Sequence, residues 1–409
     1  MRTFRFSCAL VVLALVVAGC EKPSMVPGFD LGKNYEAPLP AGQDALRKIT
    51  DPARMPDFTQ AFANTAALGE AIDHSLHYLA KPSSHKPYPC CGITHAEAVA
   101  SLKALRALVD AGGTPRQMNA AVRSRFDVYE SVGCDMRGTV LVTCYYTPIF
   151  NGSLVRTPVF RHALYKPPAD LVKLEDGSPS KRYPDRRTIE STRMYAGNEI
   201  VWLADPFEAY VAQVQGSVKI RMPDGSLKTY GYTANNGHAY KSIRAELVKD
   251  GKIARYAGLR EMFRYFRAHP EAVRTYTWRN PRYVFFAPIP DGRPRGCLNE
   301  PVTNRRTVAT DKSIFPPAAM AMVTANLPVR RGAQIGYVAW SGFALDQDAG
   351  GAIRAAGRCD LYLGVGEEAG DLAGRVKHEG RLYYLFLKRT GRPPVAGRAM
   401  AGAAQGTRP

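Results

Sequence analysis

A succession of short β-prone segments after the first third of the chain constrains its fold most strongly. From about Thr139 onward, β-branched and aromatic residues alternate with polar ones, as they do in half-buried strands. Strands are expected in GTVLVTCYYTPIF, EIVWLADP, AYVAQVQGSVKIRMPDGSLKTYGYTA, RYVFFAPI, QIGYVAWSGFAL, CDLYLGVG and RLYYLFLK. The pairs Asn151–Gly152 and Asp224–Gly225 predict tight turns. The pattern therefore predicts a mainly β protein.

Helices are expected before these strands and between two groups of them. Residues 57–125 have helical spacing of apolar side chains, and MNAAVRSRFDVYES is the third helical candidate there. Thr94, followed three residues later by Glu97, predicts an N-cap. A basic segment, KSIRAELVKDGKIARYAGLREMFRYFRAHP, predicts further helix in the middle. The strand YVFFAPI and all that follows it can rejoin the N-terminal domain, which would make the middle an insertion.

The first residues have the pattern of a lipoprotein signal peptide, expected to span residues 1–19. A basic start is followed by an apolar run, residues 9–17, that is too short to span a bilayer. Small residues directly precede Cys20, which we expect to carry the lipid. Glu21 after it favours the outer membrane and its periplasmic face. A cleaved signal with an incidental cysteine is the alternative.

Two further segments are expected to lie outside the packed domains. Residues 20–50 are rich in Pro, Gly and polar side chains, which predicts a tether. Residues 390–409 contain few large apolar side chains, which predicts a disordered tail.

The charge balance indicates an anionic partner. The formal net charge is +19, and a basic surface attracts anions. An exported lipoprotein rarely meets nucleic acid, so we expect no nucleic-acid partner. Cell-wall glycan and anionic lipid head groups fit the compartment, and a merely solvated basic face is the alternative.

Six cysteines remain if Cys8 leaves with the signal and Cys20 takes the lipid. They permit three disulfides, with the pairing left open, among Cys90, Cys91, Cys134, Cys144, Cys297 and Cys359. The absence of a CxxC pair and of nearby His spacing argues against a metal site. We expect no metal or organic cofactor.

Three aspartates near the end of the chain are the candidate reactive groups. Asp348 and Asp360 flank the pair Gly350–Gly351, and Asp311 lies upstream in VATDKSIFPP. Glycines beside charged residues allow sharp turns and close approach of another group. Taken singly, each aspartate is most simply explained as a turn residue.

Taken together, five segments resemble the membrane-bound lytic murein transglycosylase A family over about residues 90–388. They are GTVLVTCYYTPIFNGSLVRTPVFRHALYKPPADLV, PFEAYVAQVQGSVKIRMPDG, GYTANNGHAYKSI, NPRYVFF, and the block from VATDKSI through LDQDAGGAI and CDLYLGVGEEAGDLAG to GRLYYLFL. The resemblance implies a double-psi β-barrel catalytic domain with N-terminal helices, formed by residues 51–146 and 288–389. It also implies a second β domain inserted at residues 147–287, with a glycan groove between the two domains.

The resemblance further implies roles for named residues. Asp360, in the DxYxG element, is the implied catalytic acid, Asp348, in the DxGGAI element, is its neighbour, and Asp311 supports the site. The implied groove lining is Tyr145, Tyr146, Thr147, Gln215, Gly216, Ser217, Asn236, Gly237, His238, Tyr240 and Ser242. Without the resemblance, a Tyr pair in a strand is usually core, the VQGS segment is a bulge, and His238 caps a helix.

The implied reaction cleaves the β-1,4 bond between MurNAc and GlcNAc in peptidoglycan without water. The C6 hydroxyl of the same MurNAc attacks C1, so one carboxyl group suffices as acid and then base. The partners would be peptidoglycan glycan strands and possible wall-synthesis proteins. Two alternatives stay open: a non-catalytic peptidoglycan-binding lipoprotein, and a hydrolase that uses Asp348 and Asp360 as a pair.

Overall fold

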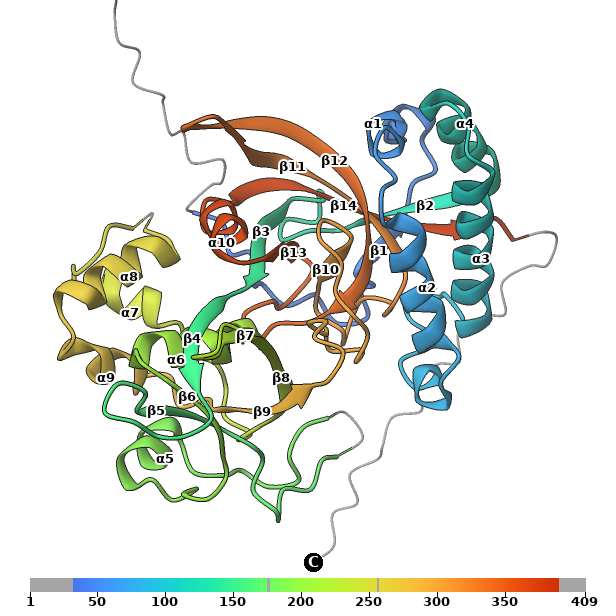
Figure 1. Ribbon diagram of the computed structural model, residues 1–409. Coiled ribbons are helices and arrows are strands. Elements are labelled where there is room, and N and C mark those ends of the chain that lie inside the picture. Colours follow the sequence, from blue (N-terminus) through green and yellow to red (C-terminus); the bar gives the residue numbers. More distant parts are fainter. Residues whose placement is uncertain (1–31, 175–176, 256, 390–409) are drawn as a thin grey trace, which may run out of the picture.

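The computed structural model describes residues 32–174, 177–255 and 257–389 (Figure 1). The predicted signal peptide, the lipidation site Cys20 and the predicted disordered tail lie outside these residues. The described end of the predicted tether differs from expectation, because Leu46–Lys48 form a strand, β1, and Ala45, Leu46 and Ile49 are buried in the core. The packed part of the chain thus begins before residue 51.

Six strands close into a barrel. In spatial order they are β14 (Lys377–Leu387), β11 (Met320–Arg331), β12 (Gln334–Asp348), β10 (Thr307–Ala309), β13 (Arg358–Val365) and β3 (Val140–Thr147). The pairing of β3 with β14 closes the ring. The pairs β13–β3 and β10–β12 are parallel, which is consistent with the predicted double-psi barrel.

Helices from the N-terminal part cover one side of the barrel (Figure 1). They are α1 (Thr59–Phe62), α2 (Leu68–Leu79), α3 (His95–Ala111) and α4 (Pro115–Arg125), with 3₁₀ turns at Pro52–Arg54 and Pro82–His85. The predicted cap is confirmed, since the Thr94 and Glu97 side chains form a capping box. The third expected helix is shorter than predicted, because Phe126–Ser131 form β2, which pairs with β14.

A second sheet of six strands lies beside the barrel. Its order is β5 (His162–Tyr165), β6 (Glu199–Leu203), β4 (Ile149–Ser153), β7 (Ser217–Arg221), β8 (Leu227–Asn235) and β9 (Val284–Ile289). Its helices are α5 (Arg186–Thr192), α6 (Pro206–Gln215), α7 (Ile243–Lys249), α8 (Leu259–Ala268) and α9 (Ala272–Thr277). The strand YVFFAPI does not rejoin the N-terminal domain as expected, because β9 pairs with β8. The later strands β10 to β14 do lie in the barrel sheet with β2 and β3.

Two local expectations in the second sheet are also wrong. Pro206–Gln215 form a helix rather than a strand, because the Asp205 side chain caps its first turn, Pro206 fits position N1 and Gly216 ends it at φ 75°. Asn151–Gly152 lie inside β4 rather than in a turn. A Cβ at Gly152 would sit 2.6 Å from Ile220 Cγ2, so the glycine serves close packing. The turn at Asp224–Gly225 is confirmed between β7 and β8.

The fold class predicted from the sequence is confirmed as a closed six-stranded barrel plus a second sheet, mostly β with N-terminal helices. The exact domain boundaries stay predictions. The six predicted bridging cysteines are free thiols in the structure. The sulfur atoms of Cys90 and Cys91 lie 4.0 Å apart.

Candidate active site

Asp348 and Asp360 lie on neighbouring parts of the barrel because both pair with the same residue. Ala309 of β10 is opposite Asp348 of β12 on one side and opposite Asp360 of β13 on the other. Residues paired across strands project from the same face of a sheet. Cys359 and Leu361 point into the barrel core, so Asp360 projects outward. The register therefore places both carboxylates on one outer face.

Asp360 has an environment that lets its carboxyl group keep its proton to a higher pH than an ordinary aspartate. Its Oδ1 is buried and has no hydrogen-bond partner among the described residues. Burial raises its pKa to about 6, although Arg358 and a hydrogen bond from Thr143 act in the opposite direction, and the charge of Asp348 adds to the rise. A carboxyl group with such a pKa is suited to general acid catalysis near neutral pH.

Asp348 is held by three donors. The Tyr145 hydroxyl donates to its Oδ2 at 2.6 Å, and the backbone N–H groups of Cys297 and Ala349 donate to its Oδ1 at 2.9 and 2.8 Å. Burial raises the pKa of Asp348, whereas these hydrogen bonds and the charge of Lys312 lower it. Because its oxygens are already occupied, Asp348 is suited to shaping the site rather than to exchanging protons.

Asp311 braces the loop that joins the other two aspartates. Its Oδ2 accepts the backbone N–H of Ala355 at 2.9 Å, and its Oδ1 accepts the hydroxyl and N–H of Ser313. These hydrogen bonds, together with the charge of Arg354, outweigh its burial and lower the pKa of Asp311. Its carboxylate thus fixes Ala355, which has a φ of 64°. The predicted substrate contact of Asp311 remains a prediction.

The strand β3 contributes three of the predicted groove residues, which have different surroundings. Tyr145 contacts Asp348, and its ring lies 5.1 Å from that of Tyr362. The Thr147 hydroxyl is buried and lies 2.9 Å from the Tyr362 hydroxyl. Tyr146 faces the opposite way, into the core, which matches the alternation of side chains along a strand. Tyr145 is therefore the member of the trio that lies at the carboxylates.

The residues Gln215, Gly216 and Ser217 form the junction between α6 and β7. The Gln215 Oε1 accepts the backbone N–H of Tyr146 at 3.3 Å, which connects α6 to the barrel strand β3. Gly216 is the C-cap of α6, and its carbonyl accepts the N–H of Tyr232 at 2.6 Å. Ser217 is buried at the start of β7. Gln215 is therefore the member of this trio that connects the second sheet to the barrel.

The polar cluster after β8 is largely occupied by backbone contacts. Asn236 is fully buried, donates to the carbonyls of Pro184 and Pro281 and accepts the N–H of Tyr283. Gly237 has a φ of 79°, and the His238 Nε2 lies 2.9 Å from the Tyr183 carbonyl.

The last residues of the polar cluster after β8 are Tyr240 and Ser242, and Tyr240 contacts the loop between Asp348 and Asp360. The Ser242 side chain caps α7 by accepting the N–H of Ala245. Tyr240 is partly buried, and a Cβ on Gly351 would lie 3.2 Å from the Cβ of Tyr240. Tyr240 of the second domain therefore touches the glycine pair beside Asp348. The structure thus brings together Asp348, Asp360, Tyr145 and Tyr240, and the other predicted residues mostly support the backbone.

Sequence reasoning missed three residues around Asp360. They are Thr143, Arg358 and Tyr362, which lie beside it in β3 and β13. The alternation of β13 was a usable signal, because residues two positions from Asp360 share its face.

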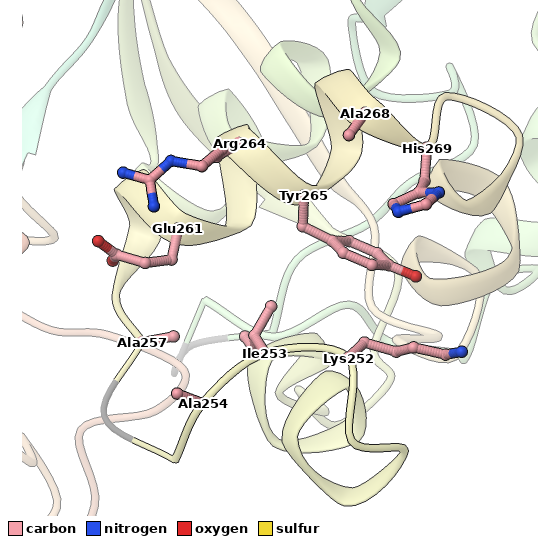
Figure 2. A pocket seen from close by; sticks show the side chains of 9 residues that line it. All are labelled: Lys252, Ile253, Ala254, Ala257, Glu261, Arg264, Tyr265, Ala268 and His269. Atoms are coloured by element: carbon pink, nitrogen blue, oxygen red, sulfur yellow. The ribbon is translucent and has the colours of Figure 1, made fainter.

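The surface has two hollows, and neither Asp348 nor Asp360 lines them. One, of about 550 Å³, is lined by residues 252–254 and 257, by side chains of α8 that include Tyr265, and by His269 (Figure 2). The other, of about 460 Å³, is lined by residues that include Cys90, Cys91 and Lys312. The predicted groove between the domains remains a prediction. The described residues contain no group of three or more His, Cys, Asp or Glu side chains arranged to hold a metal ion.

Comparisons with known proteins show the class of protein to which the chain is similar. A family model described as the MltA specific insert domain matches residues 141–287, and one described as the 3D domain matches residues 306–386. The membrane-bound lytic murein transglycosylase A of Escherichia coli K12 is 29% identical, over 96% of each chain. That of Vibrio cholerae is 30% identical, over 63% of this chain and 68% of the relative.

A solved structure agrees with these sequence matches. The crystal structure of E. coli MltA with bound chitohexaose has a TM-score of 0.64 and 26% identity, and the match covers 87% of this chain and 96% of that one. The chain belongs to the membrane-bound lytic murein transglycosylase A family. Within residues 32–389, apart from the short gaps, we find no helix with the length and apolar character needed to cross a membrane.

Proposed function

We propose that this chain is a lytic transglycosylase that cleaves the β-1,4 bond between MurNAc and GlcNAc in peptidoglycan and leaves a 1,6-anhydro-MurNAc end. The observation that carries the proposal is the buried Asp360 carboxyl group with a free oxygen and a pKa raised to about 6. Family membership supports the substrate class, since the named relatives act on murein and one of them binds chitohexaose.

In the proposed mechanism, a single carboxyl group carries out both proton transfers. Protonated Asp360 gives its proton to the glycosidic oxygen as the bond from that oxygen to C1 of MurNAc breaks. The resulting carboxylate then takes the proton of the MurNAc C6 hydroxyl as that oxygen bonds to C1. The enzyme ends protonated as it began, and no water is consumed. The nucleophile belongs to the same sugar, so the protein need not position a second reactant.

Asp348 is proposed to orient the site and to help Asp360 keep its proton to a higher pH. Its charge raises the pKa of Asp360, and its three donors keep its own position fixed. These contacts argue against the hydrolase alternative, because a general base or nucleophile needs an oxygen free to reach water or C1.

Mass spectrometry of murein digested by the purified protein separates the candidate functions. The proposed reaction gives fragments ending in anhydro-MurNAc. Reducing MurNAc ends would instead show a hydrolase, and a protein that binds murein without releasing fragments would show a non-catalytic wall-binding lipoprotein. Either of these results contradicts the proposal.

We also propose that the protein is anchored to the periplasmic face of the outer membrane through lipid on Cys20. The sequence before this cysteine supports the anchor, as does the description of the relatives as membrane-bound. Full-length protein with Cys20→Ser should move from the detergent-extracted membrane fraction to the soluble periplasmic fraction. The matched variant Cys8→Ser should stay with the membrane, and equal distribution of both variants would contradict the anchor.

A further inference from the structure

Two cationic side chains of the barrel project from the face that carries Asp360, and two from the second domain lie near enough to act on their charge. We call them the basic cluster, which consists of Arg244, Arg255, Arg358 and Lys377. Arg358 lies two residues before Asp360 on β13 and therefore projects from the same face. Lys377 of β14 pairs with Thr143, and Thr143 pairs with Asp360. Lys377 thus lies on the same outer face as Asp360, two strands away, with Thr143 of β3 between them.

The second domain supplies the other two cations. Arg244 of α7 donates from Nη1 to the backbone carbonyls of Arg255 and Ala257, at 3.0 and 3.4 Å. Close contact between the domains continues at Gly258, where an added Cβ would lie 2.6 Å from the carbonyl oxygen of Gly374. The basic cluster is therefore built where the two domains touch.

The cations of the cluster repel one another. Burial, followed by the charges of Arg244, Arg358 and Arg255, lowers the pKa of Lys377 to about 8. Arg358 is largely buried, and its Nε has no hydrogen-bond partner among the described residues. Its ion pair is with Glu36, which is more than half exposed. A bound anion would relieve this repulsion and satisfy the buried donor.

The substrate offers such an anion. A neutral sugar chain needs hydroxyl and amide partners rather than several cations, whereas carboxylates are bound well by arginine and lysine. MurNAc differs from GlcNAc by a lactyl ether that ends in a free carboxylate on naked strands. On peptide-bearing strands that group is an amide, and the carboxylates belong to the stem peptide instead.

We propose that the basic cluster is a carboxylate-binding subsite that recognises the acidic groups of murein next to the cleavage site. This inference rests on the proposed function for the identity of its ligand. It explains how a glycan-cleaving face distinguishes murein from neutral β-1,4-linked amino sugars of the same backbone.

The test measures binding, so that its result does not depend on cleavage. Fluorescently labelled naked glycan strands, the same strands with their carboxyl groups converted to methylamides, and peptide-bearing strands are titrated with the full-length Asp360→Asn protein. Adding Lys377→Met or Arg244→Gln should weaken binding of the carboxylate-bearing strands by about tenfold, the effect of losing one charge-assisted contact. Binding of the methylamide strands should stay the same.

The design distinguishes the source of the carboxylate and includes a control. If affinity is lost only for naked strands, the ligand of the subsite is the lactyl carboxylate. If it is lost only for peptide-bearing strands, the ligand is a carboxylate of the stem peptide. The variant Lys228→Met removes an exposed lysine on β8 and should leave all three affinities unchanged. The proposed subsite would be contradicted if the variants lost as much affinity for methylamide strands as for carboxylate-bearing strands, or if they lost no affinity for any strand. Failure of the proposed function shows separately, as absence of murein cleavage by the unmodified protein.

Discussion

Replacement of Asp360 by asparagine should lower kcat/KM for murein cleavage by about 10³-fold, within the range that general acid–base catalysis contributes. Asparagine has nearly the same shape but cannot give a proton to the glycosidic oxygen. The release of soluble muropeptides from purified murein measures the loss. Because Asp360 lies on the outer face of the barrel and its Oδ1 has no partner among the described residues, the variant should fold normally.

The control for this variant is Asp73→Asn, which alters an exposed carboxylate on α2 that pairs with Arg106. It should keep full activity. A second readout is the pH profile of the unmodified protein, in which kcat/KM should fall as pH rises through about 6, where Asp360 loses its proton. An Asp360→Asn protein that retains activity within tenfold of the original would contradict the assignment.

The same pKa shift has a consequence for stability. The pKa of Asp360 is about 6 in the folded protein, against an ordinary value of 3.8. Between these values the folded protein binds more protons at this site than the unfolded chain does. The contribution of Asp360 to the free energy of unfolding therefore decreases as pH rises through this window, and Asp360→Asn should remove that decrease.

Replacement of Arg186 by methionine should lower the free energy of unfolding of the second domain by about 3–5 kcal/mol, as expected when one partner of a buried charged network is removed. Arg186 is 1% exposed. Its guanidinium donates to the Asn280 and Arg282 carbonyls and to the Gln213 side chain, and also pairs with Glu190. Methionine would remove the Arg186 donor from the Asn280 and Arg282 carbonyls and from Gln213, whose oxygen would keep only the N–H of Val284.

The adjacent Arg187→Met is the matched control, because Arg187 is exposed. Its effect should stay below about 1 kcal/mol, as for most surface positions. Amide hydrogen exchange in β8 and β9 measures the local free energy of opening, which suits a protein with two sheets better than a single unfolding curve. Equal protection in the two variants would contradict the role given to Arg186.

The sequence predicted those elements whose signals are local. The capping box at Thr94 and the hairpin turn at Asp224–Gly225 need only neighbouring residues, and both are confirmed. The helix Pro206–Gln215 was missed because a short apolar run has no periodicity that separates helix from strand. Its Pro at N1 and its Gly cap carried the correct signal. Gly152 was misread because close packing, rather than a turn, requires the glycine.

The arrangement of the site depends on contacts between distant parts of the chain. That Asp348 and Asp360 share a face follows from their common partner Ala309, which lies about 40 to 50 residues earlier in the chain. The basic cluster joins α7 to β13 and β14 through packing of the two domains. Such long-range pairing is absent from local sequence patterns. For Asp348 and Asp360 the sequence alone offered the neighbouring glycine pair and the resemblance to a family, and for the basic cluster it offered neither.

The most direct test of the account is cleavage of purified murein in ¹⁸O-labelled water, followed by mass spectrometry of the fragments. Because the C6 hydroxyl of MurNAc is the proposed nucleophile, the account predicts anhydro-MurNAc ends without ¹⁸O. Reducing MurNAc ends that carry ¹⁸O at C1 would show that water attacks, and would contradict the single-aspartate transglycosylase mechanism.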